Sequence, residues 1–401
     1  MHKRVIFVDD EEQILAGLKR MLRPLRREWS MDFASSGAEA LEKMEQKPFD
    51  VIVTDMRMPG MDGAQLLQIV SDRYPDMVRI VLSGYANEEL VYKSVPFTHQ
   101  YLAKPIEAEG LKAVVSRALA LRSLLKNEKI KKLVTRVDTL PSMPKLYMSL
   151  LKELKSSDAS TKSIGNIISK DLGMTAKILK LVNSAYFGIR RHVQSPEEAV
   201  MFLGLNTIKA IVLSTEIFSQ YDETRLKNFS LEKLYEHSVT VGSFAKVIAE
   251  SEVENKKNIG DSLMAGMLHD LGKLILIDNL PDQYSIVLEQ VRNDGKLVWK
   301  VEQEVFGVSH AEVGAYLLGL WGLPDDIVEA VAYHHRPSHC VHHSFSPLTA
   351  VHVANWIAYH SQESPVEKPE ALIESAYVNL SRLTDKLPSW KQRCLQLINE
   401  K

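Results

Sequence analysis

Short apolar runs alternate with amphipathic stretches over the first 122 residues of the chain. The runs that are typical of strands cover residues 4–8, 31–34, 49–55, 78–83 and 100–102. Between and after them, apolar positions recur at helical spacing over residues 11–23, 37–46, 63–73, 87–95 and 106–122. Because strands that alternate with helices favour parallel pairing, this pattern predicts an α/β domain over residues 1–122, with a doubly wound, five-stranded parallel sheet.

The pattern changes at residues 121–138, where apolar side chains at near-helical spacing are separated by lysine and arginine. This segment predicts a linker helix, which we assign to residues 123–139. A nucleic-acid-binding arm is the weaker alternative, because one basic stretch is little evidence for such a function. Leu140-Pro141-Ser142-Met143-Pro144 then breaks the helix and marks a domain boundary.

From residue 145 onward the pattern is helical and shows no strand-like alternation. Helices are expected at residues 145–156, 161–171, 174–184, 196–203, 206–218, 231–251, 258–275, 281–294, 298–304, 310–319, 325–334, 347–361 and 368–378. Ser195-Pro196-Glu197-Glu198 has the features of a helix start, with a serine cap followed by proline and two acids. The pattern predicts an all-α domain over residues 140–361 and a helical extension over residues 362–401.

Composition narrows the classes of function. The 49 basic and 51 acidic residues give a net charge of −2, which attracts the whole chain neither to nucleic acid nor to an anionic membrane. Cys340 and Cys394 match no metal-binding or redox spacing, as expected in a reducing compartment. No apolar run approaches the ~18 residues of a membrane span. We therefore expect a cytoplasmic protein that contacts neither nucleic acid nor membrane.

Carboxylates and other polar side chains follow the ends of the predicted strands. Asp9 and Asp10 come after the first run, and Asp55 ends the third run just before a turn with proline and glycine. The carboxyl ends of parallel strands share one edge of a sheet, so these acids should lie close together. Three neighbouring carboxylates repel one another unless a cation lies among them, and oxygen ligands suit Mg²⁺. The sequence therefore predicts a magnesium site at this edge.

The same edge should receive a hydroxyl, an ammonium group and an aromatic ring. Ser83 ends the fourth run, Lys104 follows the fifth, and Tyr101 lies three residues before Lys104. A carboxylate can attack a phosphoryl group only when the charge on the transferring oxygens is neutralised, which Mg²⁺ and an ammonium group can do. These residue types therefore indicate a site for phosphoryl transfer.

Residues 2 to about 122 resemble the receiver domain of two-component response regulators. The resemblance rests on Val8-Asp9-Asp10-Glu11, residues 54–63, Leu82-Ser83-Gly84 and residues 101–105. It implies a flavodoxin-like sheet, a phosphoacceptor served by a histidine kinase, and a Lys–Pro peptide bond in the cis form. By position, Asp55 would accept the phosphate, Asp9 and Asp10 would hold Mg²⁺ with Asp55 and the Arg57 carbonyl, Ser83 and Lys104 would bind phosphoryl oxygens, and Tyr101 would change rotamer on activation.

Residues from about 140 to at least 356 resemble the HDOD domain, an all-helical relative of the HD phosphohydrolases. The motifs are Leu140-Pro141, residues 171–175, Asn183-Ser184-Ala185, His269-Asp270-Leu271-Gly272-Lys273 and residues 309–335. Residue 172 is leucine where the family often has proline. In the His…His-Asp…Asp metal pattern of the superfamily, His237, His269 and Asp270 fit the first three positions. His310, His334 and His335 resemble the extra histidines of the branch that cleaves cyclic di-GMP.

Two departures weaken the enzymatic interpretation. Asn355 stands where active relatives have aspartate, so the site loses an anionic ligand. The Gly-Tyr-Pro signature is absent after His335, where Arg336-Pro337-Ser338-His339 stands instead. These departures favour a vestigial site over a metal-dependent hydrolase. We therefore expect Mg²⁺ at the receiver site and no second metal in the helical domain.

The sequence therefore predicts a cytoplasmic response regulator that accepts phosphate on Asp55 and signals through a non-catalytic HDOD domain by protein–protein interaction. The expected partners are a histidine kinase and a downstream signalling protein, with enzymes of cyclic-dinucleotide turnover as one class. A homodimer is compatible with this interpretation. A metal-dependent HD-type phosphohydrolase, a cyclic-di-GMP phosphodiesterase controlled by the receiver, stays open as the alternative.

Overall fold

The computed structural model describes most of the chain in two units, the second of which starts at Met143. The described residues are 3–74, 77–83, 98, 100–104, 109–112, 114–116, 145–154, 156, 159–183, 187, 193–221, 229–340, 344–361, 373–380 and 383–399. The linker helix expected at residues 123–139 and the helix expected at 87–95 lie outside them. Each unit is therefore considered by itself.

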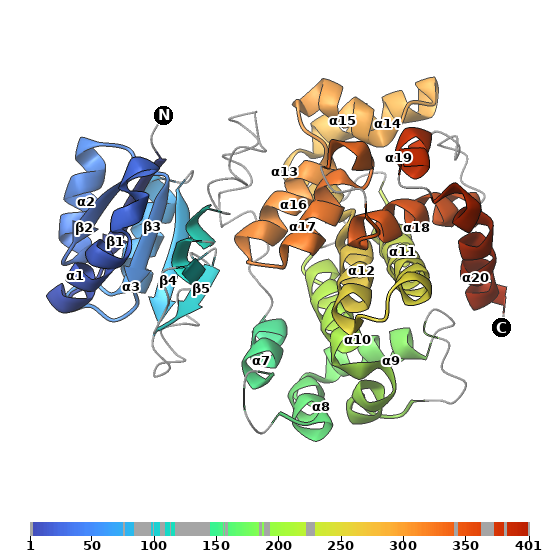
Figure 1. The fold of residues 1–401 in the computed structure, drawn as a ribbon, viewed down its shortest axis with the longest axis horizontal. Coiled ribbons are helices and arrows are strands. Elements are labelled where there is room, and N and C mark those ends of the chain that lie inside the picture. The colour runs from blue at the N-terminus through green and yellow to red at the C-terminus, as the bar shows by residue number, and fades with distance from the viewer. Residues whose placement is uncertain are drawn as a thin grey trace. The chain divides into compact units, whose positions relative to one another are not determined.

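The N-terminal unit contains the predicted parallel sheet. Its strands are β1 (Lys3–Val8), β2 (Trp29–Ala34), β3 (Val51–Asp55), β4 (Val78–Ser83) and β5 (Gln100–Ala103). They lie in the order β2-β1-β3-β4-β5, and every neighbouring pair is parallel. The helical elements between them are α1 (Glu12–Met21), η1 (Arg23–Arg27), α2 (Gly37–Gln46) and α3 (Gly63–Arg73). This arrangement confirms the doubly wound fold with five strands (Figure 1).

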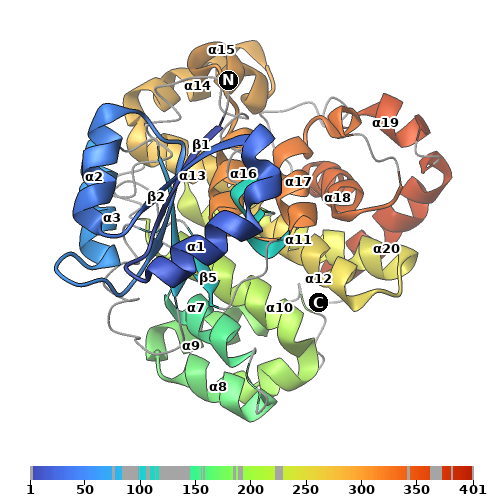
Figure 2. The same ribbon diagram turned by 60° about the vertical axis from the view of Figure 1, so that its left-hand side comes forward.

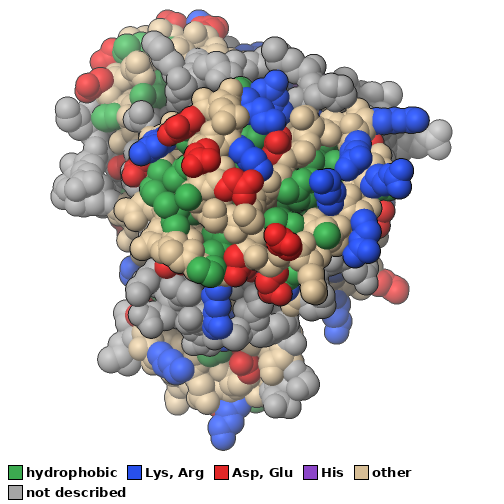
Figure 3. Space-filling model, turned by 90° about the vertical axis from the view of Figure 1, so that its left-hand side faces the viewer, with side chains coloured by type: hydrophobic (Ala, Val, Ile, Leu, Met, Phe, Trp, Pro, Cys, Tyr) green, Lys and Arg blue, Asp and Glu red, His purple; other side chains and the backbone are tan. Residues whose placement is uncertain are grey.

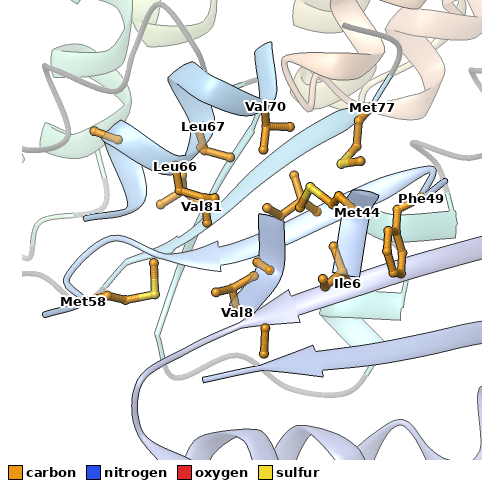
Figure 4. Close-up of a cluster of buried hydrophobic side chains, with 14 of the residues drawn as sticks. Ile6, Val8, Met44, Phe49, Met58, Leu66, Leu67, Val70, Met77 and Val81 are labelled. Atoms are coloured by element: carbon orange, nitrogen blue, oxygen red, sulfur yellow. The ribbon is translucent and has the colours of Figure 1, made fainter. Parts of the chain in front are cut away.

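Helices cover both faces of the sheet, with α2 and α3 together on one face and α1 on the other (Figure 2). Alternate residues of a strand point to opposite faces, so Ile6 and Val8 of β1 contribute to the core beneath α2 and α3. Figure 4 shows them packed with Met44 of α2 and with Leu66 and Leu67 of α3. The apolar residues that recur at helical spacing in the sequence therefore pack against this face of the sheet and bury it.

The starts of α2 and α3 are fixed by side-chain caps. Ser36 Oγ accepts a hydrogen bond from the Glu39 backbone N–H at 3.2 Å. Asp62 and Gln65 form a capping box, in which each side chain accepts a hydrogen bond from the other residue's backbone N–H. Because Asp62 also ends the loop after β3, its cap anchors the segment that follows Asp55.

The surface of the N-terminal unit carries an exposed basic cluster at the end of α1 and in η1. Figure 3 shows a face of the molecule on which lysine and arginine side chains gather towards one side, while acidic and apolar side chains lie among the rest. The exposed members of the cluster are Lys19, Arg20, Arg23, Arg26 and Arg27.

The described part of the C-terminal unit is helical throughout, as the sequence predicts. Its α-helices are α7 (Lys145–Glu153), α8 (Thr161–Ser169), α9 (Leu172–Val182), α10 (Pro196–Phe218), α11 (Leu231–Glu252), α12 (Lys256–Leu268), α13 (Leu271–Asn279), α14 (Pro281–Asp294), α15 (Val298–Phe306), α16 (His310–Leu320), α17 (Asp325–Tyr333), α18 (Pro347–Ser361), α19 (Ser375–Leu380) and α20 (Leu387–Asn399), with short 3-10 turns η5 (Pro337–His339) and η7 (Thr384–Lys386) (Figure 1).

One helix expected from the sequence is in fact two. The single helix expected over residues 258–275 breaks at Asp270, whose φ of −99° and ψ of 6° are not helical, so α12 ends and α13 begins there. Both helices are almost entirely buried on either side of the break. Because the break is buried, the apolar pattern continues through it without change. The turn at His269-Asp270 could therefore not be predicted from the pattern of apolar residues.

Helix α10 is bent at Gly204, whose φ of 76° lies in the left-handed region that glycine tolerates. The bend separates the two helices expected at 196–203 and 206–218, and Ser195 caps the first as predicted. By length and composition α10 is also a candidate membrane span, although 56% of its most apolar window is buried inside the protein. The buried core helix of a soluble protein passes the same test, so α10 is weak evidence for a membrane span.

Candidate functional site

The sheet register aligns the polar residues at the carboxyl ends of the strands. Val8 lies opposite Thr54, so Asp9 follows β1 at the level of Asp55 at the end of β3. Ser83 lies opposite Ala103, the residue before Lys104. The side chains of Ser83 and Tyr101 lie outside the described residues. The structure therefore brings Asp9, Asp55 and Lys104 to one edge, as the sequence predicts.

Lys104 joins the two buried acids at this edge. Its ammonium donates a hydrogen bond to Asp9 Oδ2 at 2.7 Å and also forms an ion pair with Asp55 Oδ1. Asp55 Oδ2 accepts a hydrogen bond from the Arg57 backbone N–H at 2.7 Å, which orients the carboxylate. Burial lowers the pKa of Lys104, but the hydrogen bonds and charges of Asp55 and Asp9 outweigh burial and raise it, so the ammonium stays charged.

The charge at this edge fits a divalent cation. Asp9, Asp10 and Asp55 contribute three negative charges, and Lys104 compensates only one of them, which leaves an excess of two. Their oxygens are the ligand type that Mg²⁺ prefers. Asp10 is exposed, and among the described residues the three acids do not form a cluster within 4.8 Å. The residues thus fit Mg²⁺ in charge and ligand type.

Gly63 allows the loop after Asp55 to return close to β3. Its backbone N–H donates a hydrogen bond to the Met56 carbonyl at 2.9 Å. A Cβ at this position would collide with the Asp55 carbonyl oxygen and lie 2.9 Å from Met56 Cα. Glycine at position 63 is therefore required by the close approach at the predicted phosphoacceptor.

A second cluster of polar side chains is buried in the C-terminal unit. It assembles from α11, the α12–α13 break, α16, the end of α17 and α18, and all of its side chains but that of His335 are buried. Its members are His237, His269, Asp270, His310, His334, His335 and Asn355. Two groups within it could each hold a metal ion, because their ligand atoms lie within 4.8 Å of one another. One group is His237, His269 and Asp270; the other is Asp270, His310, His334 and His335, so Asp270 is common to both.

Two histidines of the cluster are held in the orientation of metal ligands. His269 Nδ1 donates to the Gly266 carbonyl at 2.7 Å, and His334 Nδ1 donates to the Val331 carbonyl at 2.8 Å. These bonds leave both Nε2 atoms unprotonated, buried and without a hydrogen-bond partner. Metal-ligating histidines are fixed in this way by a bond from the other ring nitrogen. Burial lowers the pKa of both rings, which keeps them neutral as ligands must be.

His310 is oriented by a carboxylate that the sequence analysis missed. Glu302 is fully buried and accepts hydrogen bonds from His310 Nδ1 at 2.6 Å, the His310 backbone N–H at 2.8 Å and Tyr284 Oη at 2.8 Å. Burial opposes protonation of His310, but Glu302 outweighs it and raises the pKa of the ring to about 9. The signal in the sequence was an acid on the apolar face of the helix, four residues after Val298 and four before Phe306.

Asp270 is the anionic centre of the cluster. Its Oδ2 accepts a hydrogen bond from Lys273 Nζ at 2.8 Å, and its Oδ1 lies 3.0 Å from His310 Nε2 without the alignment of a hydrogen bond. Burial alone would raise its pKa, but His269, Lys273 and His310 hold the pKa well below its usual range. Asp270 is therefore ionised, as a ligand shared between two metal groups would have to be.

Asn355 affects the protonation of His237, which belongs to the group of His237, His269 and Asp270. Its Oδ1 lies 3.0 Å from His237 Nε2, and an amide oxygen can only accept, so His237 must donate this proton. The nitrogen that faces the cluster is then protonated and lacks a lone pair for a metal. The group of Asp270, His310, His334 and His335 does not include Asn355, and its imidazole and carboxylate donors are the type that transition metals prefer; a metal there would have to displace the proton that Glu302 favours on His310.

Comparisons with known proteins agree with this division of the chain. A family model for the response regulator receiver domain matches residues 5–116, and a model for the HDOD domain matches residues 140–337. An uncharacterized protein of Treponema pallidum (strain Nichols) is 27% identical over 244 residues, which are 59% of this chain and 46% of that protein. The hydrogenase transcriptional regulatory protein HoxA of Cupriavidus necator is 35% identical over 122 residues, 30% of this chain and 25% of HoxA.

Solved structures resemble the chain in fold. A crystal structure of an HDOD domain protein with unknown function from Geobacter sulfurreducens covers 72% of this chain and 99% of its own, with a TM-score of 0.50 and 21% identity. A putative phosphohydrolase from Shewanella amazonensis SB2B covers 68% of this chain and 99% of its own, with the same TM-score and identity. The chain spans about half of the Treponema protein and a quarter of HoxA, so the activities of these relatives do not transfer to it directly.

Proposed function

The chain is a two-component response regulator that joins a receiver domain to an HDOD domain, and from this premise we propose that phosphate on Asp55 controls the output of the helical unit. A histidine kinase would supply the phosphoryl group, and Mg²⁺ held by Asp9, Asp10 and Asp55 would neutralise it. The observation that carries the proposal is Lys104, whose ammonium bridges Asp9 and Asp55 and stands where it can compensate the charge of an added phosphate.

The receiver would act by shifting an equilibrium between two conformations, because a phosphoryl group on Asp55 adds charge beside Lys104. For the output, we propose protein–protein interaction, with a partner among the enzymes of cyclic-dinucleotide turnover as one class and a homodimer as another. The neutral Asn355 and the protonated His237 Nε2 support a non-catalytic role of the first metal group. A cytoplasmic location agrees with such a soluble relay.

The test compares which proteins bind in each phosphorylation state. Tagged wild-type protein and Asp55→Asn protein are used to capture partners, each with and without acetyl phosphate and Mg²⁺. We expect a partner whose recovery changes at least about five-fold with the phosphodonor for the wild type only, as a coupling of 1 kcal/mol or more gives. Partner recovery that is the same in all four samples would refute regulated binding.

A metal-dependent phosphohydrolase is the second candidate function, and the unpartnered Nε2 atoms of His269 and His334 favour it. Asp270, His310, His334 and His335 would hold the metal, with His269 beside them. When bound, such a metal would polarise a phosphoryl oxygen and lower the pKa of a bound water. The chain's own part is to keep the imidazoles oriented through Glu302 and the two backbone carbonyls, and to place Lys273 where it can bind phosphate.

Metal content separates the two candidates. If the cluster is a metal site, wild-type protein purified without chelators should retain about one transition-metal ion per chain, and His334→Ala should lose at least ~90% of it, since one imidazole is removed. His339→Ala is the matched control, because His339 is exposed and close in sequence but outside the cluster. Elemental analysis makes the measurement. Wild-type protein that is metal-free after growth with added metals would leave the vestigial interpretation standing.

A further inference from the structure

A tryptophan with two cations lies next to the histidine cluster. Trp299, in the first turn of α15, is partly exposed, and its ring stacks on His335 with centroids 5.8 Å apart and planes at 19°. The Lys300 ammonium lies 5.4 Å from the centre of the ring, and the Arg336 guanidinium lies 5.3 Å from it. Through His335, whose Nε2 is 3.1 Å from His310 Nε2, the ring adjoins the candidate metal group.

The two cations are held differently. Arg336 is fixed, because one of its nitrogens donates to Glu312 Oε1 at 3.0 Å, and Glu312 is itself held by the Ser309 backbone N–H and by Gln303 at 2.8 Å. Lys300 is exposed and forms no ion pair within the described part of the chain. Lys296, four residues earlier, does pair, with Glu304 at 2.9 Å. The surface thus offers one anchored and one unpaired positive charge, both close to an aromatic ring.

Cation–π contacts with an exposed ring are weak, whereas stacking of a nucleobase on an aromatic side chain is stronger. A base could therefore displace the Lys300 ammonium from the ring, and the flexible lysine would then be free to pair with a phosphate. Arginine presents a planar pair of donors that suits phosphate, and Arg336 has donors left beyond the one that binds Glu312. Neither a plain acidic peptide nor an apolar ligand would use both the ring and the two cations.

We propose that Trp299, Lys300 and Arg336 form a nucleotide-binding platform at the edge of the histidine cluster, with the base stacked on Trp299 and the phosphate held by Lys300 and Arg336. The ligand class is a nucleoside phosphate or phosphodiester. This inference goes beyond the proposed output by protein interaction, and it needs neither a bound metal nor hydrolysis. Binding at this platform would give the helical unit an input of its own, besides phosphorylation of the receiver.

Isothermal titration of the full-length chain tests the platform with three probes: GMP, AMP and ribose 5-phosphate, which has no base. We expect at least one of the nucleotides to bind more tightly than ribose 5-phosphate. Trp299→Leu should weaken nucleotide binding by about ten-fold or more while leaving ribose 5-phosphate unchanged. Trp299→Phe, which keeps a stacking face, should stay within about three-fold of the wild type. Lys300→Ala should weaken all three probes, and Lys296→Ala should weaken none.

Three outcomes would overturn the proposal. They are no nucleotide binding at millimolar concentration, nucleotide affinities that Trp299→Leu does not change, and equal binding of ribose 5-phosphate and nucleotides, which would indicate a phosphate site only. Circular dichroism checks that Trp299→Leu is folded; if it is not, the comparison of nucleotides with ribose 5-phosphate on the wild type and the loss in Lys300→Ala keep the proposal testable. Phosphorylation of Asp55 in the same preparations is scored separately, so failure of the platform is distinguishable from failure of the receiver.

Discussion

Acetyl phosphate with Mg²⁺ is expected to add one phosphoryl group to the wild-type protein and none to Asp55→Asn. The amide of asparagine cannot attack phosphorus as the carboxylate does, and it removes the negative charge that Lys104 balances. We do not expect the other acids of the edge to replace Asp55, because in the receiver pattern Asp9 and Asp10 are the positions that hold Mg²⁺. Intact-mass spectrometry measures the added group directly.

Asp62→Asn is the matched control for this experiment. Asp62 lies in the same loop as Asp55, but its carboxylate caps α3 through the Gln65 backbone N–H at 2.8 Å. Asparagine is an equally good cap, so this variant should fold and accept phosphate like the wild type. A mass shift that persists in Asp55→Asn, or that disappears in Asp62→Asn alone, would contradict the assignment of the phosphoacceptor.

Much of the described part of the receiver could be predicted from the sequence because its evidence is local. Each polar residue follows an apolar strand directly, and parallel pairing then places the strand ends together without further information. Asp9, Asp55 and Lys104 therefore lie together, as expected. What the sequence did not show is that Lys104 contacts both Asp9 and Asp55 while Asp10 is exposed, because these contacts depend on side-chain rotamers and not on spacing.

The helical site was less predictable because its members come from five separate elements. Family resemblance picked out the histidines and Asp270, but no periodicity could show the break at Asp270 or the backbone carbonyls that orient His269 and His334. Glu302 was missed because an acid within an apolar stripe is ambiguous until its partners are known. The vestigial interpretation rested on Asn355 and on the missing Gly-Tyr-Pro signature; Asn355 affects only one of the two metal groups, and the other is formed without it.

Gly272→Ala is expected to destabilise the helical unit strongly, because α13 and α16 touch through their backbones at this residue. A Cβ on Gly272 would collide with the His310 carbonyl oxygen and lie 2.7 Å from the His310 carbonyl carbon and 2.8 Å from the Gly314 nitrogen. These are backbone atoms that cannot rotate away, so α16 would have to move. We expect a loss of about 3 kcal/mol or more in the free energy of unfolding.

Gly314→Ala is the control with a milder clash at the same contact. Its Cβ would lie 3.1 Å from the Gly272 nitrogen and 3.5 Å from Val331 Cγ1. We therefore expect a smaller loss in the free energy of unfolding, about 1 kcal/mol. Calorimetry can follow both variants, and phosphorylation of Asp55 should persist in each, because the receiver has its own core. Displacing α16 also moves His310 from Asp270, so Gly272→Ala should lose any bound metal even at temperatures where it is folded. A Gly272→Ala protein with wild-type stability and metal content would show that α13 and α16 do not hold the histidine cluster together.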